Sequence, residues 1–229
     1  IYLTYAAIFK FFGVSMFWLR LVTLIVVLAT ATVIYEIGQK VLGSPRSPRG
    51  EAGGEAGTKR ALLAAFAFGF LTSLRLIEGN LALTEIFMVL PISAAMMVAI
   101  LRKFDYLSLF VSGILFAVAS LYKQVGAFEA AALGIFLFLY TPKFSEFFKK
   151  GVILSAGFAL PYSLTILYFA PKGLLGDYIF AAYTYYQIYL EESPQYAMLI
   201  NVLKFLPIVS AIVYGFWEKR TKRIDVFHL

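Results

Sequence analysis

The sequence predicts an all-α fold, a polytopic bundle of transmembrane helices. Of its 229 residues, 61% are hydrophobic and only 14% are charged, whereas soluble domains carry about 25% charged residues. The mean hydropathy is +0.83. Apolar runs of membrane-spanning length recur along the chain and are separated by short polar gaps. Lipid, rather than water, is therefore expected to surround most of the protein.

The expected elements begin with a short N-terminal helix from Tyr2 to Phe12, ended by Gly13. Because a spanning helix needs about 20 apolar residues, about seven spans are expected to follow. They lie at residues 16–41, 61–77, 83–101, 105–121, 124–140, 151–169 and 196–217. Residues 1–229 are interpreted as one transmembrane domain, and as part of a longer protein because the chain begins inside an apolar stretch.

Two segments interrupt this pattern. Residues 42–60 are rich in Pro, Gly, Ser and charge, which predicts a flexible cytoplasmic linker without packed structure. Residues 170–195 form a Tyr-rich outer loop in which Tyr alternates with aliphatic residues at roughly helical spacing. This loop is interpreted as an aromatic belt at the membrane surface, with a platform for sugar rings as the alternative.

The basic residues fix the expected orientation. Lys40, together with alternate gaps and the C-terminal tail, holds 14 of the 20 Lys and Arg. By the positive-inside rule these positions are cytoplasmic, so the spans begin outside and end inside. The net charge of +7 is therefore a signature of topology, and nucleic acid is not an expected partner.

Several kinds of site are excluded by composition. Cysteine is absent and the single histidine, His228, stands next to the C-terminus. Disulfide frameworks, Cys-based or His-rich metal sites and His-dependent catalytic triads are therefore excluded. The acidic residues at the outer face are few and scattered, so neither a metal ion nor another cofactor is expected.

One group of polar residues, Arg75, Glu78, Asn80 and Glu85, punctuates a helix–break–helix element at the outer surface. Arg75 and Glu78 share a helical face and could form an ordinary interfacial ion pair. Glu85 opens the next apolar run without a basic neighbour in sequence. Either Thr84 caps that helix with Glu85 in its first turn, or Glu85 belongs to a site; the pattern leaves both open.

Lys123 and Gln124 divide two apolar runs at the outer face, where topology disfavours positive charge. A compact ammonium at the mouth of a helical bundle suits a phosphate. The alternative is that Lys123 only ends a helix and extends to the interface.

Four segments resemble one known family. IYLTYAAIFKFFGVSMFWLRL (1–21) and VIYEIGQKVLG (33–43) are similar to the segment after the first outer loop, and to the end of the next span, in GT-C membrane glycosyltransferases. The resemblance is to the protein-mannosyltransferase and aminoarabinose-transferase group. NLALTEIFMVLPISAA (80–95) and ASLYKQVGAF (119–128) are similar to two further motifs of that group.

The resemblance implies a polyprenyl- or dolichyl-phosphate sugar donor and a protein or lipid acceptor outside the cytoplasm, in the cell membrane or the endoplasmic reticulum membrane. It places Lys123 on the family's lysine, with Gln124 beside it at the donor phosphate, and Glu85 on its acidic residue. Arg75, Glu78 and Asn80 would support the substrate site. The family's catalytic Asp lies in the first outer loop, upstream of Ile1, so this piece alone is expected to be inactive.

Two other functions remain open. A secondary transporter would use Glu85, Lys123 and Glu129 as a coupling network at the bilayer midplane, although no internal repeat is evident. A non-catalytic membrane scaffold subunit would account for the missing Asp.

Overall fold

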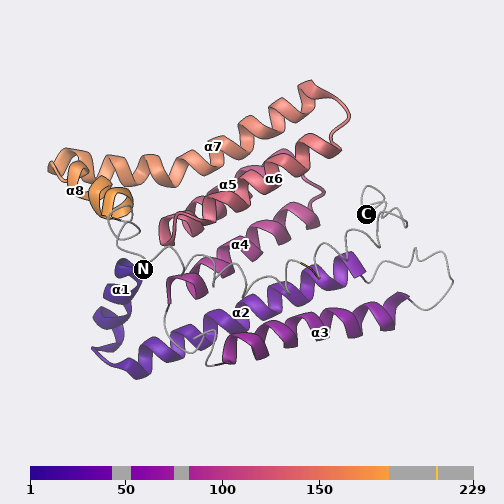
Figure 1. The fold of residues 1–229 in the computed structure, drawn as a ribbon, viewed down its shortest axis with the longest axis horizontal. Helices are drawn as coiled ribbons and strands as arrows, with labels where there is room; N and C mark the ends of the chain where they lie inside the picture. The colour runs from indigo at the N-terminus through magenta and orange to yellow at the C-terminus, as the bar shows by residue number, and fades with distance from the viewer. Residues whose placement is uncertain (43–52, 75–82, 186–209, 211–229) are drawn as a thin grey trace. The chain divides into compact units, whose positions relative to one another are not determined.

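The computed structural model describes residues 1–42, 53–74, 83–185 and 210, and every regular element within these ranges is helical (Figure 1). The chain divides into two compact units, Ile1–Leu164 and Thr165–Leu229. The expected all-α fold is thus confirmed for the described part of the chain.

The first unit contains the helices that correspond to the expected short helix and to six expected spans. They are α1 (Tyr2–Phe12), α2 (Met16–Leu42), α3 (Gly53–Ser73), α4 (Thr84–Leu101), α5 (Tyr106–Tyr122), α6 (Gly126–Tyr140) and α7 (Phe144–Phe169), the last of which continues into the second unit. The seventh expected span, 196–217, lies outside the described residues except for Ser210.

Three of the described helical segments are long and apolar enough to cross a membrane: Met16–Leu42, Thr84–Leu101 and Phe144–Lys172. The apolar helices α5 and α6 have 17 and 15 residues, at or below the lower limit of about 17 for a span. A protein with several membrane-spanning helices therefore fits the structure, whereas the number seven stays a prediction.

The expected linker at 42–60 is wrong at both of its ends. Leu42 still belongs to α2, and α3 begins at Gly53. In the added turns Glu55 forms an exposed ion pair with Lys59, with 2.7 Å between the carboxylate oxygen and the ammonium nitrogen, and α3 packs closely on α2. A Cβ atom on Gly38 would lie only 2.8 Å from the Ala61 Cβ atom. Residues 43–52 lie outside the described part.

The hydrophobic core lies among α4, α5, α6 and the first part of α7. Its buried side chains are Ala95, Ala99, Leu109, Phe116, Leu133, Leu137 and Leu154. Buried Ser112 on α5 donates a hydrogen bond to the Ala95 carbonyl oxygen of α4 across 2.8 Å. Helix α5 is thus the common neighbour of α4 and α6.

Backbones meet where α5 crosses α7. A Cβ atom on Gly113 would overlap the Leu154 carbonyl oxygen and lie 2.8 Å from the Phe158 backbone nitrogen. A Cβ atom on Gly157 would overlap the Phe110 carbonyl oxygen in the same way. Small residues permit this close approach of helices, which is a common packing mode in membranes. The two glycines fix where α7 sits on α5.

A tight turn joins α4 to α5. Lys103 and Phe104 have φ angles of 55° and 58°, in the left-handed region that residues with side chains rarely occupy. Asp105 then caps α5 by accepting a hydrogen bond from the Ser108 backbone N–H across 2.7 Å. At the start of the chain, Gly13 ends α1 with a φ of 86°, as predicted.

In the second unit, the described part of the Tyr-rich segment is helical. It comprises η1 (Ala170–Lys172), α8 (Leu175–Ile179) and η2 (Phe180–Thr184). The rings of Phe169 and Tyr178 stack with centroids 5.1 Å apart. Residues 186–195 of the expected outer loop lie outside the described part.

Candidate functional site

Lys123 stands at the C-terminal end of α5, in the three-residue connection to α6. Its backbone is extended (φ −153°, ψ 131°), so the helix stops there, and its N–H donates to the Ala119 carbonyl oxygen across 3.2 Å. The Lys123 carbonyl oxygen accepts a hydrogen bond from the Gly126 N–H across 2.9 Å. Gly126 packs so closely that a Cβ atom would lie 2.9 Å from the Ser120 nitrogen. The position of the Lys123 backbone is therefore well defined.

Glu85 lies in the first turn of α4, as predicted, and the alternative in which Thr84 caps this helix does not hold. The N-cap residue is Leu83, Thr84 is already helical, and no side chain caps this helix end. Instead, the Glu85 carboxylate forms an ion pair with the Lys123 ammonium. The pair joins the start of α4 to the end of α5, two points 38 residues apart in sequence.

This ion pair is accessible from outside the bundle. The Lys123 side chain is 30% exposed and that of Glu85 is 49% exposed. A pair with this exposure gains little free energy from its attraction in water. The pair instead determines a position: it holds the Lys123 ammonium at the N-terminal end of α4, where the ammonium can meet an anion.

Side chains from three other helices contact the end of α5 just before Lys123. The Phe87 and Tyr122 rings stack with centroids 6.0 Å apart, and the Tyr122 hydroxyl shares a hydrogen bond of 2.9 Å with the Thr4 hydroxyl. One turn earlier on α5, the Ser120 and Tyr162 hydroxyls share a hydrogen bond of 2.6 Å. Helices α1, α4 and α7 thus each contribute a contact to the last two turns of α5.

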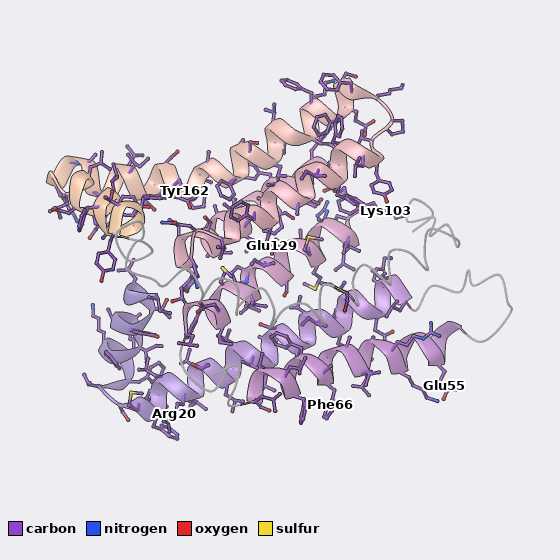
Figure 2. The ribbon with its side chains drawn as sticks, in the orientation of Figure 1. Arg20, Glu55, Phe66, Lys103, Glu129 and Tyr162 are labelled. Atoms are coloured by element: carbon purple, nitrogen blue, oxygen red, sulfur yellow. The ribbon has the colours of Figure 1, made fainter. Side chains whose placement is uncertain are left out.

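The structure brings together two of the residues singled out from sequence, Glu85 and Lys123. Gln124 follows Lys123 in the same connection and is half-buried. Glu129 lies in the first turn of α6 and is exposed; in the described part of the chain it takes no part in an ion pair. Three further predicted residues, Arg75, Glu78 and Asn80, lie outside the described residues. Figure 2 labels Glu129 on α6 and Tyr162 on α7.

Sequence reasoning missed the neighbours of the ion pair. Tyr122 precedes Lys123 directly, yet no sequence signal links its hydroxyl to Thr4, 118 residues away. Ser120 and Tyr162 read as ordinary residues of two apolar helices. Their pairing depends on how α5 and α7 cross, which the sequence pattern does not specify.

Within the described ranges, no group of three or more acidic or histidine side chains gathers at a point that could hold a metal ion. The candidate site consists of one oriented ammonium, that of Lys123, with the Glu85 carboxylate beside it. Such an arrangement can bind an anion by exchanging the carboxylate for it.

Comparison of the chain with protein-family models, with curated proteins and with solved structures gives no match. The resemblance to GT-C glycosyltransferases therefore rests on the sequence segments described above.

Proposed function

We propose that this chain is the membrane domain of a glycosyltransferase. In this proposal it moves a sugar from a polyprenyl- or dolichyl-phosphate carrier to a protein or lipid acceptor on the extracytoplasmic side of the membrane. The topology expected from the sequence, about seven spans with the basic gaps in the cytoplasm, would leave the Lys123 end of α5 on that outer side. The catalytic Asp would lie in chain upstream of Ile1.

The observation that carries the proposal is the ion pair between Lys123 and Glu85. When a sugar leaves a lipid phosphate, negative charge develops on the phosphate oxygens, and a fixed cation that neutralises it lowers the barrier. Lys123 has a defined backbone position and a partly exposed ammonium, which suits this role. The half-exposed Glu85 carboxylate holds the ammonium in place until a phosphate displaces it.

Glu85 has a supporting role in this proposal. In the absence of donor its carboxylate would pair with the Lys123 ammonium, and the donor phosphate would replace it there. After displacement it stands near the acceptor side without acting as the catalytic base. Gln124, next along the chain, is the second candidate donor of hydrogen bonds to the phosphate.

The position of the pair favours this function over a secondary transporter. Coupling residues of transporters lie near the bilayer midplane, where helices are broken. Glu85 is the second residue of α4, and Lys123 follows the last residue of α5. The charged pair is thus at the ends of its helices rather than at their middles.

The test uses the full-length protein in liposomes that contain polyprenyl-phosphate mannose or polyprenyl-phosphate aminoarabinose together with acceptor. Lys123→Gln should lower transfer about 100-fold or more, as loss of one charge-stabilising donor does in other enzymes. Lys123→Arg should retain a measurable part because it keeps the charge. Glu85→Gln should lower the KM for the donor, since the competing carboxylate is gone.

Lys10→Gln is the matched control. Lys10 is an exposed basic residue of α1, and its loss should leave transfer unchanged. If Lys123→Gln transfers sugar at the wild-type rate from both donors, Lys123 has no part in the reaction. If the wild-type protein transfers neither sugar, the proposed function itself is wrong for these donors.

A further inference from the structure

Two turns of the chain are neighbours at the opposite end of the bundle. The α4–α5 turn contains Phe104, whose ring contacts that of Phe136 on α6 with centroids 5.3 Å apart. Phe136 in turn contacts Tyr140, the last residue of α6, at 4.6 Å. The α6–α7 turn follows immediately. An unbroken row of rings therefore connects the two turns.

The basic residues at these turns fall into two groups. Arg102 pairs with Asp105 at 3.0 Å, and Lys150 pairs with Glu146 at 3.1 Å. These two contacts use the carboxylates of the two turns. Lys103, Lys143 and Lys149 are exposed, and among the described residues none of them forms an ion pair. We call these three lysines the two-turn face; Figure 2 labels Lys103.

Large apolar side chains accompany the two-turn face. Phe144 and Phe148 are 69% and 60% exposed, and they lie one helical turn apart on α7, next to Lys143 and Lys149. Lysines beside exposed aromatic rings, at the end of an apolar helix, have the chemistry of a membrane interface. The rings enter the acyl region while the ammonium groups stay at the headgroups.

We propose that the two-turn face binds anionic lipid headgroups of the leaflet that it meets, through the lipid phosphates. The charge is complementary, because within the described ranges no carboxylate pairs with the ammonium groups of these three lysines. The row of rings from Phe104 to Tyr140 connects the two turns that carry these lysines. This inference does not depend on the proposed transferase activity.

The test titrates the full chain in detergent with phosphatidylglycerol and counts bound lipids by native mass spectrometry. Lys143→Gln with Lys149→Gln should weaken binding by about fivefold for each lysine removed, and adding Lys103→Gln should weaken it again. The charge-preserving pair Lys143→Arg with Lys149→Arg should bind as the wild type does. Thermal unfolding by circular dichroism, with equal transitions for all variants, verifies that folding is intact.

The matched control removes two exposed charges elsewhere, Lys10→Gln with Arg20→Gln, and should bind phosphatidylglycerol as tightly as the wild type. Figure 2 labels Arg20 on α2. Equal weakening by this control would overturn the proposal, because binding would then follow net charge alone. So would unchanged binding by the Lys143 and Lys149 variant. Equal competition by phosphatidylcholine, by inorganic phosphate or by an acidic peptide would also overturn it.

Discussion

The two ends of α5 hold charged residues in different ways. At its start, Asp105 is satisfied by residues three positions away: Ser108 on one side and Arg102 on the other. At its end, Lys123 is satisfied by Glu85, 38 residues earlier on another helix. The first arrangement forms with the turn itself. The second exists only after α4 and α5 have packed together.

This difference separates a stabilising contact from a candidate functional one. A local cap makes a helix end more stable wherever the helix goes. A partly exposed ion pair between helices adds little free energy, but it sets where an ammonium stands. Variants at the two ends of α5, and at its middle, should therefore have unequal effects.

The largest effect is expected between the two ends, at Gly113→Ala. The added methyl group would overlap the Leu154 carbonyl oxygen, so α7 must move away from α5, at a cost of about 1–3 kcal/mol. Denaturant unfolding in detergent measures the change. Gly134→Ala on α6 is the matched control: nothing lies within 4 Å of its added methyl group, and it should leave stability unchanged or raise it by up to about 1 kcal/mol. Equal effects at both glycines would contradict the close crossing.

The next effect is expected at the local end. Asp105→Ala removes both the acceptor that caps α5 at the Ser108 N–H and the pair with Arg102, and should raise the unfolding equilibrium constant several-fold. Asp105→Asn should cost less, since asparagine caps helices about as well as aspartate. Equal losses from the two variants would mean that the charge of Asp105, and not its cap, stabilises the turn.

The free energy of unfolding should also depend on pH through Asp105, at the start of α5. The hydrogen bond from the Ser108 backbone N–H, with a smaller contribution from Arg102, lowers the pKa of Asp105 below its ordinary value. A lowered folded-state pKa stabilises the protein above the unfolded-state pKa, and this stability is lost as pH falls through the folded-state pKa. Unfolding curves of the wild type and Asp105→Asn should therefore converge in that acid range. Parallel curves would exclude this linkage.

The smallest effect on stability is expected at the long-range end. Lys123→Gln and Glu85→Gln should each change the free energy of unfolding by less than about 1 kcal/mol, because both side chains are partly exposed. The same Lys123 variant should lose sugar transfer, as proposed above. A large loss of stability from Lys123→Gln, measured by the same denaturant unfolding, would show that the pair is a structural contact. The two ends of α5 would then not differ in how much their charged residues stabilise the fold.

The sequence predicts features that depend on residues close together in the chain, and it does not predict features that depend on packing between helices. Apolar runs and Gly13 correctly predict helices and the end of α1, because both depend on neighbouring residues. The linker boundary fails because the contact of the added turns with α2, such as the hydrogen bond from Thr58 to Gln39 across 3.5 Å, is an interaction between helices that composition does not reveal. Lys123 and Glu85 stood out separately because a charge is conspicuous in an apolar sequence; their pairing, and the Thr4 and Tyr162 contacts, depend on the packing of the bundle.

The crossing at Gly113 and Gly157 has a consequence for any survey of tolerated substitutions. No other amino acid fits at either position without moving a backbone, whereas substitution of Glu85 or Lys123 is expected to leave the protein folded. In a library selected for folding alone, the two glycines should be the most restricted positions in α5 and α7. Glu85 and Lys123 should become restricted only when the library is selected for sugar transfer. Comparison of the two selections would then separate residues that determine the packing of the bundle from residues that take part in its chemistry.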